Sequence, residues 1–92
     1  MSELRKTITI VNQRGLHARA SAKLVEVTTR WPEATEIQVA KDGRAVDGRS
    51  ILDLMMLGAA MGDQITIKAT GPDAAQALSQ LVTLVEDKFG EE

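Results

Sequence analysis

The chain contains no cysteine, and His17 is its only histidine. The lack of thiols excludes disulfides and thiolate metal sites, and one histidine leaves neither a metal cluster nor a Ser-His or Cys-His catalytic arrangement. We therefore expect no bound metal and no cofactor. A cysteine-free chain also suits the cytoplasm, where thiols are kept reduced.

Aromatic residues and excess positive charge are also scarce. Trp31 and Phe89 are the only aromatic residues, and the net charge is -2 at pH 7. Neither the stacking platforms of RNA-binding domains nor a basic nucleic-acid surface is therefore expected. The glycines form neither a phosphate loop nor a dinucleotide fingerprint. No apolar run is long enough to cross a bilayer, and residues 1–5 lack a secretion signal's apolar core, so we expect a cytoplasmic protein without membrane insertion.

The residues that are present predict one α+β domain over residues 1–92. Hydrophobic residues make up 43% of the chain and charged residues 26%, which is typical of a globular domain. Alternating and helical spacings give the order βαββαβα, best accommodated by one antiparallel sheet with its helices on one face. The predicted strands are 4–11, 36–41, 44–47 and 64–70, and the predicted helices run from His17 to Pro32, from Ser50 to Gly58 and from Pro72 to Gly90.

Several inward faces follow from the same spacings. Asp42-Gly43 predicts a two-residue hairpin turn between two of the strands. In the first helix we expect a buried stripe of Ala20, Leu24, Val27 and Trp31, widened by Ala18, Ala22 and Val25. In the strands we expect Leu4, Ile8, Ile10, Ile37, Val39, Ile65, Ile67 and Ala69 to face the core, joined by Ala74, Leu78, Leu81 and Val85 of the last helix.

The stretch from Asn12 to Lys23 carries the strongest functional signal. It is a strand-to-helix turn in which Gly15 allows unusual backbone angles and His17 stands where the helix begins. The first N–H groups of a helix lack internal partners and carry positive potential, so a helix start can hold a phosphate. An imidazole there is disfavoured as a cation, which makes it a neutral nucleophile near pH 7. Arg19 can donate a charge-assisted hydrogen bond to an anion on His17, whereas Arg14 is read as surface charge.

A second, short helix begins at Ser50. Asp53 follows at capping-box spacing, so Ser50 is expected to be the N-cap. The following residues are apolar on almost every face, and a two-turn helix cannot bury all of them against one sheet. Part of this helix must therefore be exposed.

Two segments resemble a known family. Gly15-Leu16-His17-Ala18-Arg19 is similar to the active-site signature of HPr, the histidine-containing phosphocarrier of the bacterial phosphoenolpyruvate-dependent phosphotransferase system. Gly48-Arg49-Ser50-Ile51-Leu52, with the Leu57-Gly58 ending, resembles the family's second signature. Ala20 stands where the family usually has proline, which bears on branch and partner preference. Together with the run 54–57, it is closer to carriers of the nitrogen-related branch than to dedicated sugar-transport carriers.

The resemblance implies an open-faced sandwich with strand order 1-4-2-3 and the role of a stoichiometric phosphoryl carrier rather than an enzyme. It implies that His17 accepts a phosphoryl group on Nδ1 from enzyme I and passes it to enzyme IIA proteins, for sugar uptake, nitrogen-related regulation or both. Arg19 would stabilise the charge, the phosphate would lie on residues Ala18, Arg19 and Ala20, and the protein would act as a monomer. The resemblance further implies a docking patch and a regulatory site: Leu16, Ile51, Leu52 and Met55 would contact partners, Leu54 and Leu57 would face inward, and Ser50 would be the target of an HPr kinase/phosphorylase where the host has one.

An alternative class remains open. The chain could be a small α+β regulatory or binding module that recognises a partner through Met55 and its neighbours, with no phosphoryl transfer. Labelling by phosphoenolpyruvate and enzyme I separates these two functions.

Overall fold

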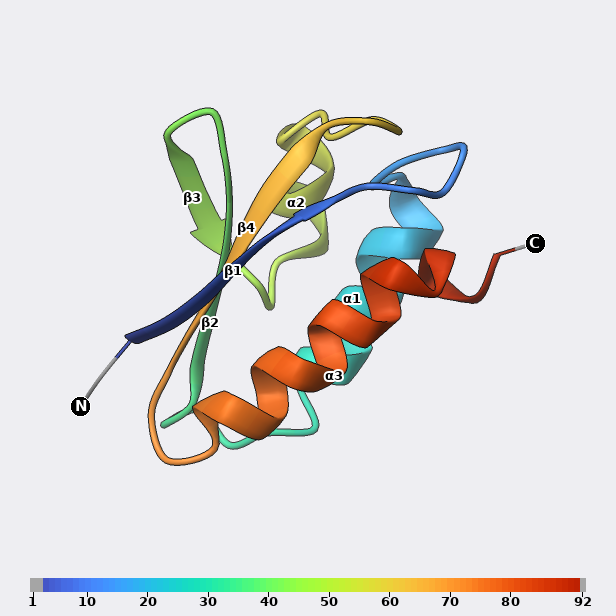
Figure 1. Ribbon diagram of the computed structural model, residues 1–92. Helices are drawn as coiled ribbons and strands as arrows, with labels where there is room; N and C mark the ends of the chain where they lie inside the picture. Colours follow the sequence, from blue (N-terminus) through green and yellow to red (C-terminus); the bar gives the residue numbers. More distant parts are fainter. Residues whose placement is uncertain (1–2, 92) are drawn as a thin grey trace.

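The computed structural model describes residues 3–91 and contains one sheet covered on one face by helices (Figure 1). In chain order the elements are β1 (Glu3–Thr9), α1 (Ala18–Thr28), β2 (Glu36–Lys41), β3 (Arg44–Asp47), α2 (Ile51–Met56), β4 (Gln64–Thr70), α3 (Ala74–Glu86) and a 3-10 turn (Lys88–Gly90).

All strand pairs in the sheet are antiparallel, and the strand order is β1-β4-β2-β3. Ile8 of β1 lies opposite Ile65 of β4, and Val39 of β2 lies opposite Ile67. These pairs place branched apolar side chains on one face, where each is less than a tenth exposed. The βαββαβα order and the strand order 1-4-2-3 confirm the predicted open-faced sandwich.

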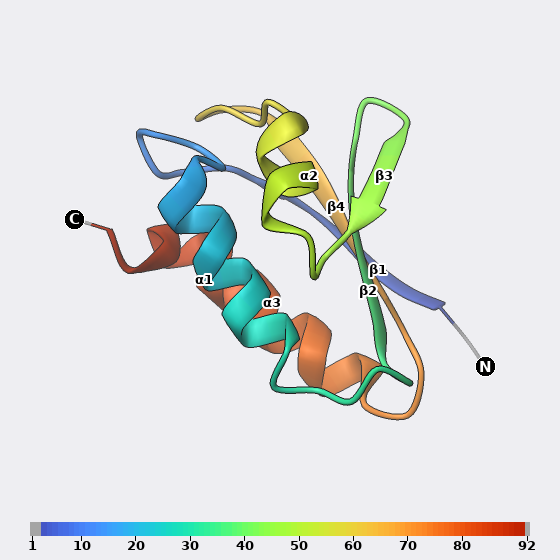
Figure 2. The same cartoon turned by 180° about the vertical axis from the view of Figure 1, so that it is seen from behind.

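The helices cover the apolar face of the sheet. Figures 1 and 2 show α1 and α3 packed side by side, with α2 beside α1. The short β3 strand lies at the sheet edge, as expected. The fully buried side chains between the helices and the sheet include Leu24, Leu54, Leu81, Val85 and Phe89. No helix among residues 3–91 is long and apolar enough to cross a bilayer.

The hairpin prediction is confirmed in its geometry. Asp42 and Gly43 have φ angles of 52° and 83°, so both central residues of the turn are left-handed. This is the arrangement of a type I′ turn, whose twist matches that of the flanking strands.

Several predicted element boundaries differ from the structure. The α1 helix ends at Thr28, before the predicted Pro32. β1 ends at Thr9 rather than Val11. The α3 helix begins at Ala74, because Gly71 packs its backbone against Ala34 and the amide of Asp73 donates to Oγ1 of Thr35 at 3.4 Å. A non-helical turn therefore occupies residues 71–73. At its other end α3 stops at Glu86, before the predicted Gly90.

The predicted core was too broad on the first helix. Trp31 is only partly buried, and Ala18 and Ala22 are exposed. Ser21 and Thr28 are buried in their stead, because each hydroxyl donates to a nearby backbone carbonyl, of Leu16 and Leu24 respectively. Such bonds let a small polar side chain replace an apolar one inside a core. Leu4, 39% exposed near the start of β1, and the half-buried Leu78 also depart from the prediction.

Candidate phosphoryl-acceptor site

His17 is the N-cap of α1, as the sequence predicted. Its φ and ψ angles are -75° and -176°, and its carbonyl accepts the bond from the Ser21 amide at 2.9 Å. The amides of the three residues between them precede this first intrahelical bond and have no carbonyl to reach within the helix. They belong to Ala18, Arg19 and Ala20, the residues predicted to hold a phosphate.

The turn that presents His17 is fixed by the loop between α2 and β4. Gly15 has a φ of 62°, and a Cβ there would lie 2.3 Å from the carbonyl oxygen of Ala59. The next amide, that of Leu16, donates to the same carbonyl at 2.9 Å. Only glycine fits this approach without displacing backbone, so Gly15 sets the position of the helix start.

The C-terminal segment adds a carboxylate to the imidazole. Oε2 of Glu91 lies 2.5 Å from Nε2 of His17, and the Asn12 amide donates to Oε1 of Glu91 at 3.0 Å. The side chains of His17 and Glu91 are 18% and 16% exposed, so the contact is partly shielded from water. Residues 74 positions apart in the sequence therefore meet at the predicted active centre.

The sequence analysis missed both Glu91 and Asn12. Asn12 lay inside the stretch that was singled out, but no motif gave it a role. Glu91 belongs to a charged tail that no local pattern connects with His17, and only the packing of α3 brings it there.

Electrostatics at this carboxylate favour its ionised form. The hydrogen bond from Asn12 is the largest cause lowering the pKa of Glu91, and the hydrogen bond and charge of His17 and the charge of Arg14 add to it, while partial burial opposes them. Arg14 is exposed, which agrees with its interpretation as surface charge, and its charge is the smallest of the causes that act on Glu91.

Arg19 lies in the first turn of α1 and is exposed, two residues from the imidazole. At that place its guanidinium is accessible to an anion arriving at the helix start.

The second predicted region is also built as a cap and an apolar surface. Oγ of Ser50 accepts from the Asp53 amide at 3.2 Å, which confirms the N-cap. Leu54 and Leu57 face the core, as expected. The outward face of α2 carries the residues that we call the α2 patch: Ile51 (41% exposed), Leu52 (66%) and Met55 (39%).

Leu16 departs from the predicted docking surface. Its side chain is 4% exposed and belongs to the hydrophobic core. A buried side chain offers a partner almost no area, so Leu16 supports the turn beneath the site instead of contacting a partner.

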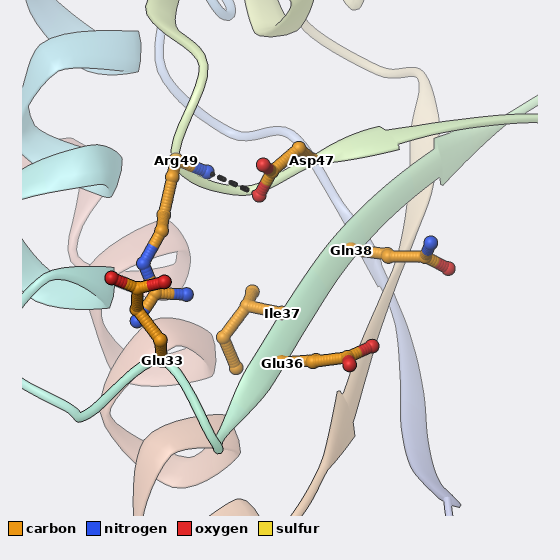
Figure 3. A pocket seen from close by; sticks show the side chains of 6 residues that line it. All are labelled: Glu33, Glu36, Ile37, Gln38, Asp47 and Arg49. Atoms are coloured by element: carbon orange, nitrogen blue, oxygen red, sulfur yellow. Dashed lines mark hydrogen bonds between the residues drawn. The ribbon is translucent and has the colours of Figure 1, made fainter.

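The polar side chains that line another surface pocket do not point toward a common centre. It is lined by Glu33, Glu36, Ile37, Gln38, Asp47 and Arg49 (Figure 3). In Figure 3, Glu33 lies beside Arg49, whereas Glu36 and Gln38 project from β2 away from both. The Arg49 side chain has a structural role, since its guanidinium donates a hydrogen bond to the backbone carbonyl of Trp31 at 2.9 Å. Within residues 3–91, no group of three His, Cys, Asp or Glu side chains could hold a metal ion.

Comparison with known proteins matches residues 4–87 to the family described as "PTS HPr component phosphorylation site". Phosphocarrier protein HPr of Cupriavidus necator is 40% identical over 88 residues, covering 96% of this chain and 97% of that protein. Phosphocarrier protein NPr of Shewanella violacea is 37% identical over 91 residues, covering 99% of this chain and 98% of that protein.

Solved structures show the same fold. HPr from Thermoanaerobacter tengcongensis superimposes with a TM-score of 0.88 at 40% identity, covering 100% of this chain and 99% of that chain. HPr from Bacillus anthracis gives 0.85 at 33% identity, covering 92% and 99%.

Proposed function

The chain belongs to the HPr family of phosphotransferase-system phosphocarriers, and from this premise we propose that His17 accepts a phosphoryl group from phospho-enzyme I and passes it to enzyme IIA proteins. The observation that carries the proposal is the imidazole at the N-cap of α1, next to three amides that precede the helix's first internal bond. Such amides attract an anion and stabilise charge on phosphoryl oxygens.

The transfer is a displacement at phosphorus. The lone pair of Nδ1 forms the new P–N bond while the donor's bond to phosphorus breaks, and the donor keeps that electron pair. In the discharge step, a nucleophile of an enzyme IIA protein attacks the same phosphorus, the P–N bond breaks, and His17 keeps the electron pair of that bond. The protein is then regenerated rather than turning over a substrate, so we assign it the role of a stoichiometric carrier, not an enzyme, acting in the cytoplasm where its partners are expected.

The other predicted residues take distinct roles in this proposal. The amides of Ala18, Arg19 and Ala20 hold the phosphoryl oxygens, and the Arg19 guanidinium neutralises part of their charge. The α2 patch receives enzyme I and enzyme IIA in turn, since α2 packs beside α1. A methionine in it suits a surface that must fit more than one partner.

Ser50 is proposed as a regulatory position in addition to its cap. A phosphate on Oγ would stand at the positive end of α2, next to Ile51 and Leu52, both exposed. It would place charge at the border of the docking surface without removing core contacts. An HPr kinase/phosphorylase is the partner this role requires.

The test is labelling with phosphoenolpyruvate and enzyme I, followed by intact-protein mass spectrometry. The wild-type chain should gain one phosphoryl group, stable in base and lost in acid, and His17→Ala should gain none while keeping its circular dichroism and melting temperature. Labelling of the folded alanine variant would overturn the assignment of His17. Relatives named HPr and NPr match at similar identity, so the enzyme IIA protein that discharges the carrier decides between sugar transport and nitrogen-related regulation.

A further inference from the structure

We propose that Glu91 is a positioning residue for phosphoryl acceptance, keeping the proton of the His17 ring on Nε2 so that the Nδ1 lone pair is free to attack phosphorus. The proposal rests on the function proposed above for His17. Its starting point is the 2.5 Å contact between Nε2 and Oε2 of Glu91.

The chain adopts a strained path to bring Glu91 to the ring. Lys88, Phe89 and Gly90 have φ angles of 57°, 56° and 72°, three consecutive left-handed residues of which two carry side chains. Non-glycine residues rarely adopt this conformation, and it persists only where the surroundings hold it. Here the Phe89 side chain is fully buried, and its carbonyl accepts from Nζ of Lys23 at 2.8 Å. This anchored turn ends directly at Glu91.

A second anchor holds the carboxylate itself. The buried Asn12 amide donates to the Gly15 carbonyl at 2.9 Å and to Oε1 of Glu91 at 3.0 Å. If the Asn12 amide were rotated by half a turn, its oxygen would face the Gly15 carbonyl and the Glu91 carboxylate, neither of which can donate. The two hydrogen bonds therefore fix the orientation of this amide. With Oε1 held in this way, Oε2 remains for the imidazole. The lowered pKa of Glu91 keeps this carboxylate ionised.

The consequence for the ring follows from donor and acceptor chemistry. A neutral imidazole has one N–H and one lone pair, and an ionised carboxylate only accepts. The Glu91 contact therefore requires the N–H on Nε2 and leaves the lone pair on Nδ1. When Nδ1 bonds to phosphorus, the ring becomes cationic and keeps its Nε2 proton. The carboxylate then stabilises the charge that develops, without taking part in the bond that forms.

The first measurement is the ring N–H signal of His17 by NMR on the full chain, which requires no partner protein. In the wild type the Nε2 proton should be visible, because its bond to Glu91 slows exchange with water. Glu91→Ala should lose the signal, whereas Glu86→Ala, which removes an exposed carboxylate at the end of α3, should keep it. A signal unchanged in Glu91→Ala would overturn the positioning role.

The second measurement is the rate of phosphorylation by enzyme I across carrier concentrations. Glu91→Ala should lower the maximal rate about tenfold, as expected for loss of one charge-assisted hydrogen bond, and leave KM within about twofold. Glu91→Gln keeps an acceptor oxygen and should recover part of that rate, and Glu86→Ala should match the wild type. A tenfold rise in KM at an unchanged maximal rate would instead make Glu91 a docking residue and overturn the proposal. A wild-type chain that accepts no phosphoryl group would overturn the proposed function together with this inference.

Discussion

At the residue scale, His17 is held between two kinds of polar group. Nε2 meets the Glu91 carboxylate, and the backbone N–H groups at the start of α1 follow directly in the chain. A nucleophile needs an available lone pair, and the phosphoryl group it accepts needs donors around its oxygens. In the role proposed for His17, the two ring nitrogens therefore have different tasks: Nε2 donates to Glu91, and Nδ1 supplies the lone pair.

Arg19 provides the prediction that belongs to this scale. Arg19→Ala should fold normally but slow acceptance from enzyme I, donation to enzyme IIA, or both, by about tenfold or more. The reason is the loss of a hydrogen bond between charged groups, worth about 1.5–3 kcal/mol. Rapid-quench transfer assays in each direction give the rates.

The matched control lies beyond the far end of α1. Arg30→Ala also removes an exposed guanidinium, but Arg30 follows the last residue of the helix, Thr28, and pairs with Glu26 at 3.7 Å. Its transfer rates should equal those of the wild type. Rates within twofold of wild type for Arg19→Ala in both directions would return Arg19 to the class of surface charges.

At the element scale, local signals predicted most of what the structure contains. The strands 36–41, 44–47 and 64–70 match their predicted bounds, because alternation, turn residues and register all specify the same arrangement. The His17 and Ser50 caps were likewise predictable, since a cap depends on residues within one turn of it.

The remaining features depend on contacts between distant segments. The start of α3 is shifted by Gly71 packing against Ala34, and its end is followed by a left-handed turn stabilised by the burial of Phe89. Likewise, Leu16 is buried because the loop carrying Ala59 closes over its turn. The Glu91 contact has the same origin. No sequence window contains both partners of these contacts, so periodicity could not reveal them.

The α2 helix provides a prediction that separates the cap at Ser50 from the proposed docking role of the helix. Ser50→Asp keeps a good capping residue, so the melting temperature should stay nearly unchanged, while the added charge beside Ile51 and Leu52 should raise the carrier concentration needed for phosphorylation more than it lowers the maximal rate. Ser50→Ala should do the opposite, costing about 1 kcal/mol of unfolding free energy with normal kinetics. Thermal melts and enzyme I titrations measure the two effects.

Each variant serves as the other's control in this design. If Ser50→Asp left the concentration dependence unchanged, Ser50 would be a cap without a regulatory role. If both variants weakened docking equally, the cause would be the disturbed helix start rather than the charge.

At the scale of the whole molecule, the site joins the turn after the first strand to the C-terminal segment. The turn after β1 carries Asn12 and His17, and α3, which packs on β1 and β4, carries the chain back to Glu91. Figure 1 shows the C-terminal segment returning beside the first turn of α1. Integrity of the site therefore depends on the global fold, and the hydrogen bonds to Glu91 should in turn contribute to global stability.

Two pKa shifts, one at the site and one at the hairpin between β2 and β3, make the stability of the fold depend on pH. The hydrogen bond from Asn12 is the first cause holding the pKa of Glu91 below its ordinary 4.5, so its stabilisation is fully present above pH 4.5 and is lost as the pH falls through the folded-state value. The hydrogen bond to Asp42, which accepts from Nζ of Lys41 at 3.0 Å, leads the causes raising the pKa of Lys41 above 10.5. Its contribution is present below pH 10.5 and is lost as the pH rises through the folded-state value.

The last prediction follows from the acid side of this balance. Asn12 and His17 contact the Glu91 carboxylate and, together with the charge of Arg14, favour its ionised form. Glu91→Gln should therefore be less stable than the wild type near pH 7, and the difference should close as the pH falls below about 4.5. Urea denaturation from about pH 7 to about pH 3 measures the free energies of unfolding, and the exposed Glu86→Gln change controls for the loss of one negative charge.

At neutral pH the Glu91 carboxylate is ionised in both the folded and the unfolded wild type. The difference in unfolding free energy between wild type and Glu91→Gln there reports the full contribution of the contacts to Glu91. Below the folded-state pKa both states are protonated at this position, and the wild-type side chain no longer differs from glutamine in charge. A gap of constant size across the range would mean that the carboxylate gains nothing from its contacts with Asn12 and His17.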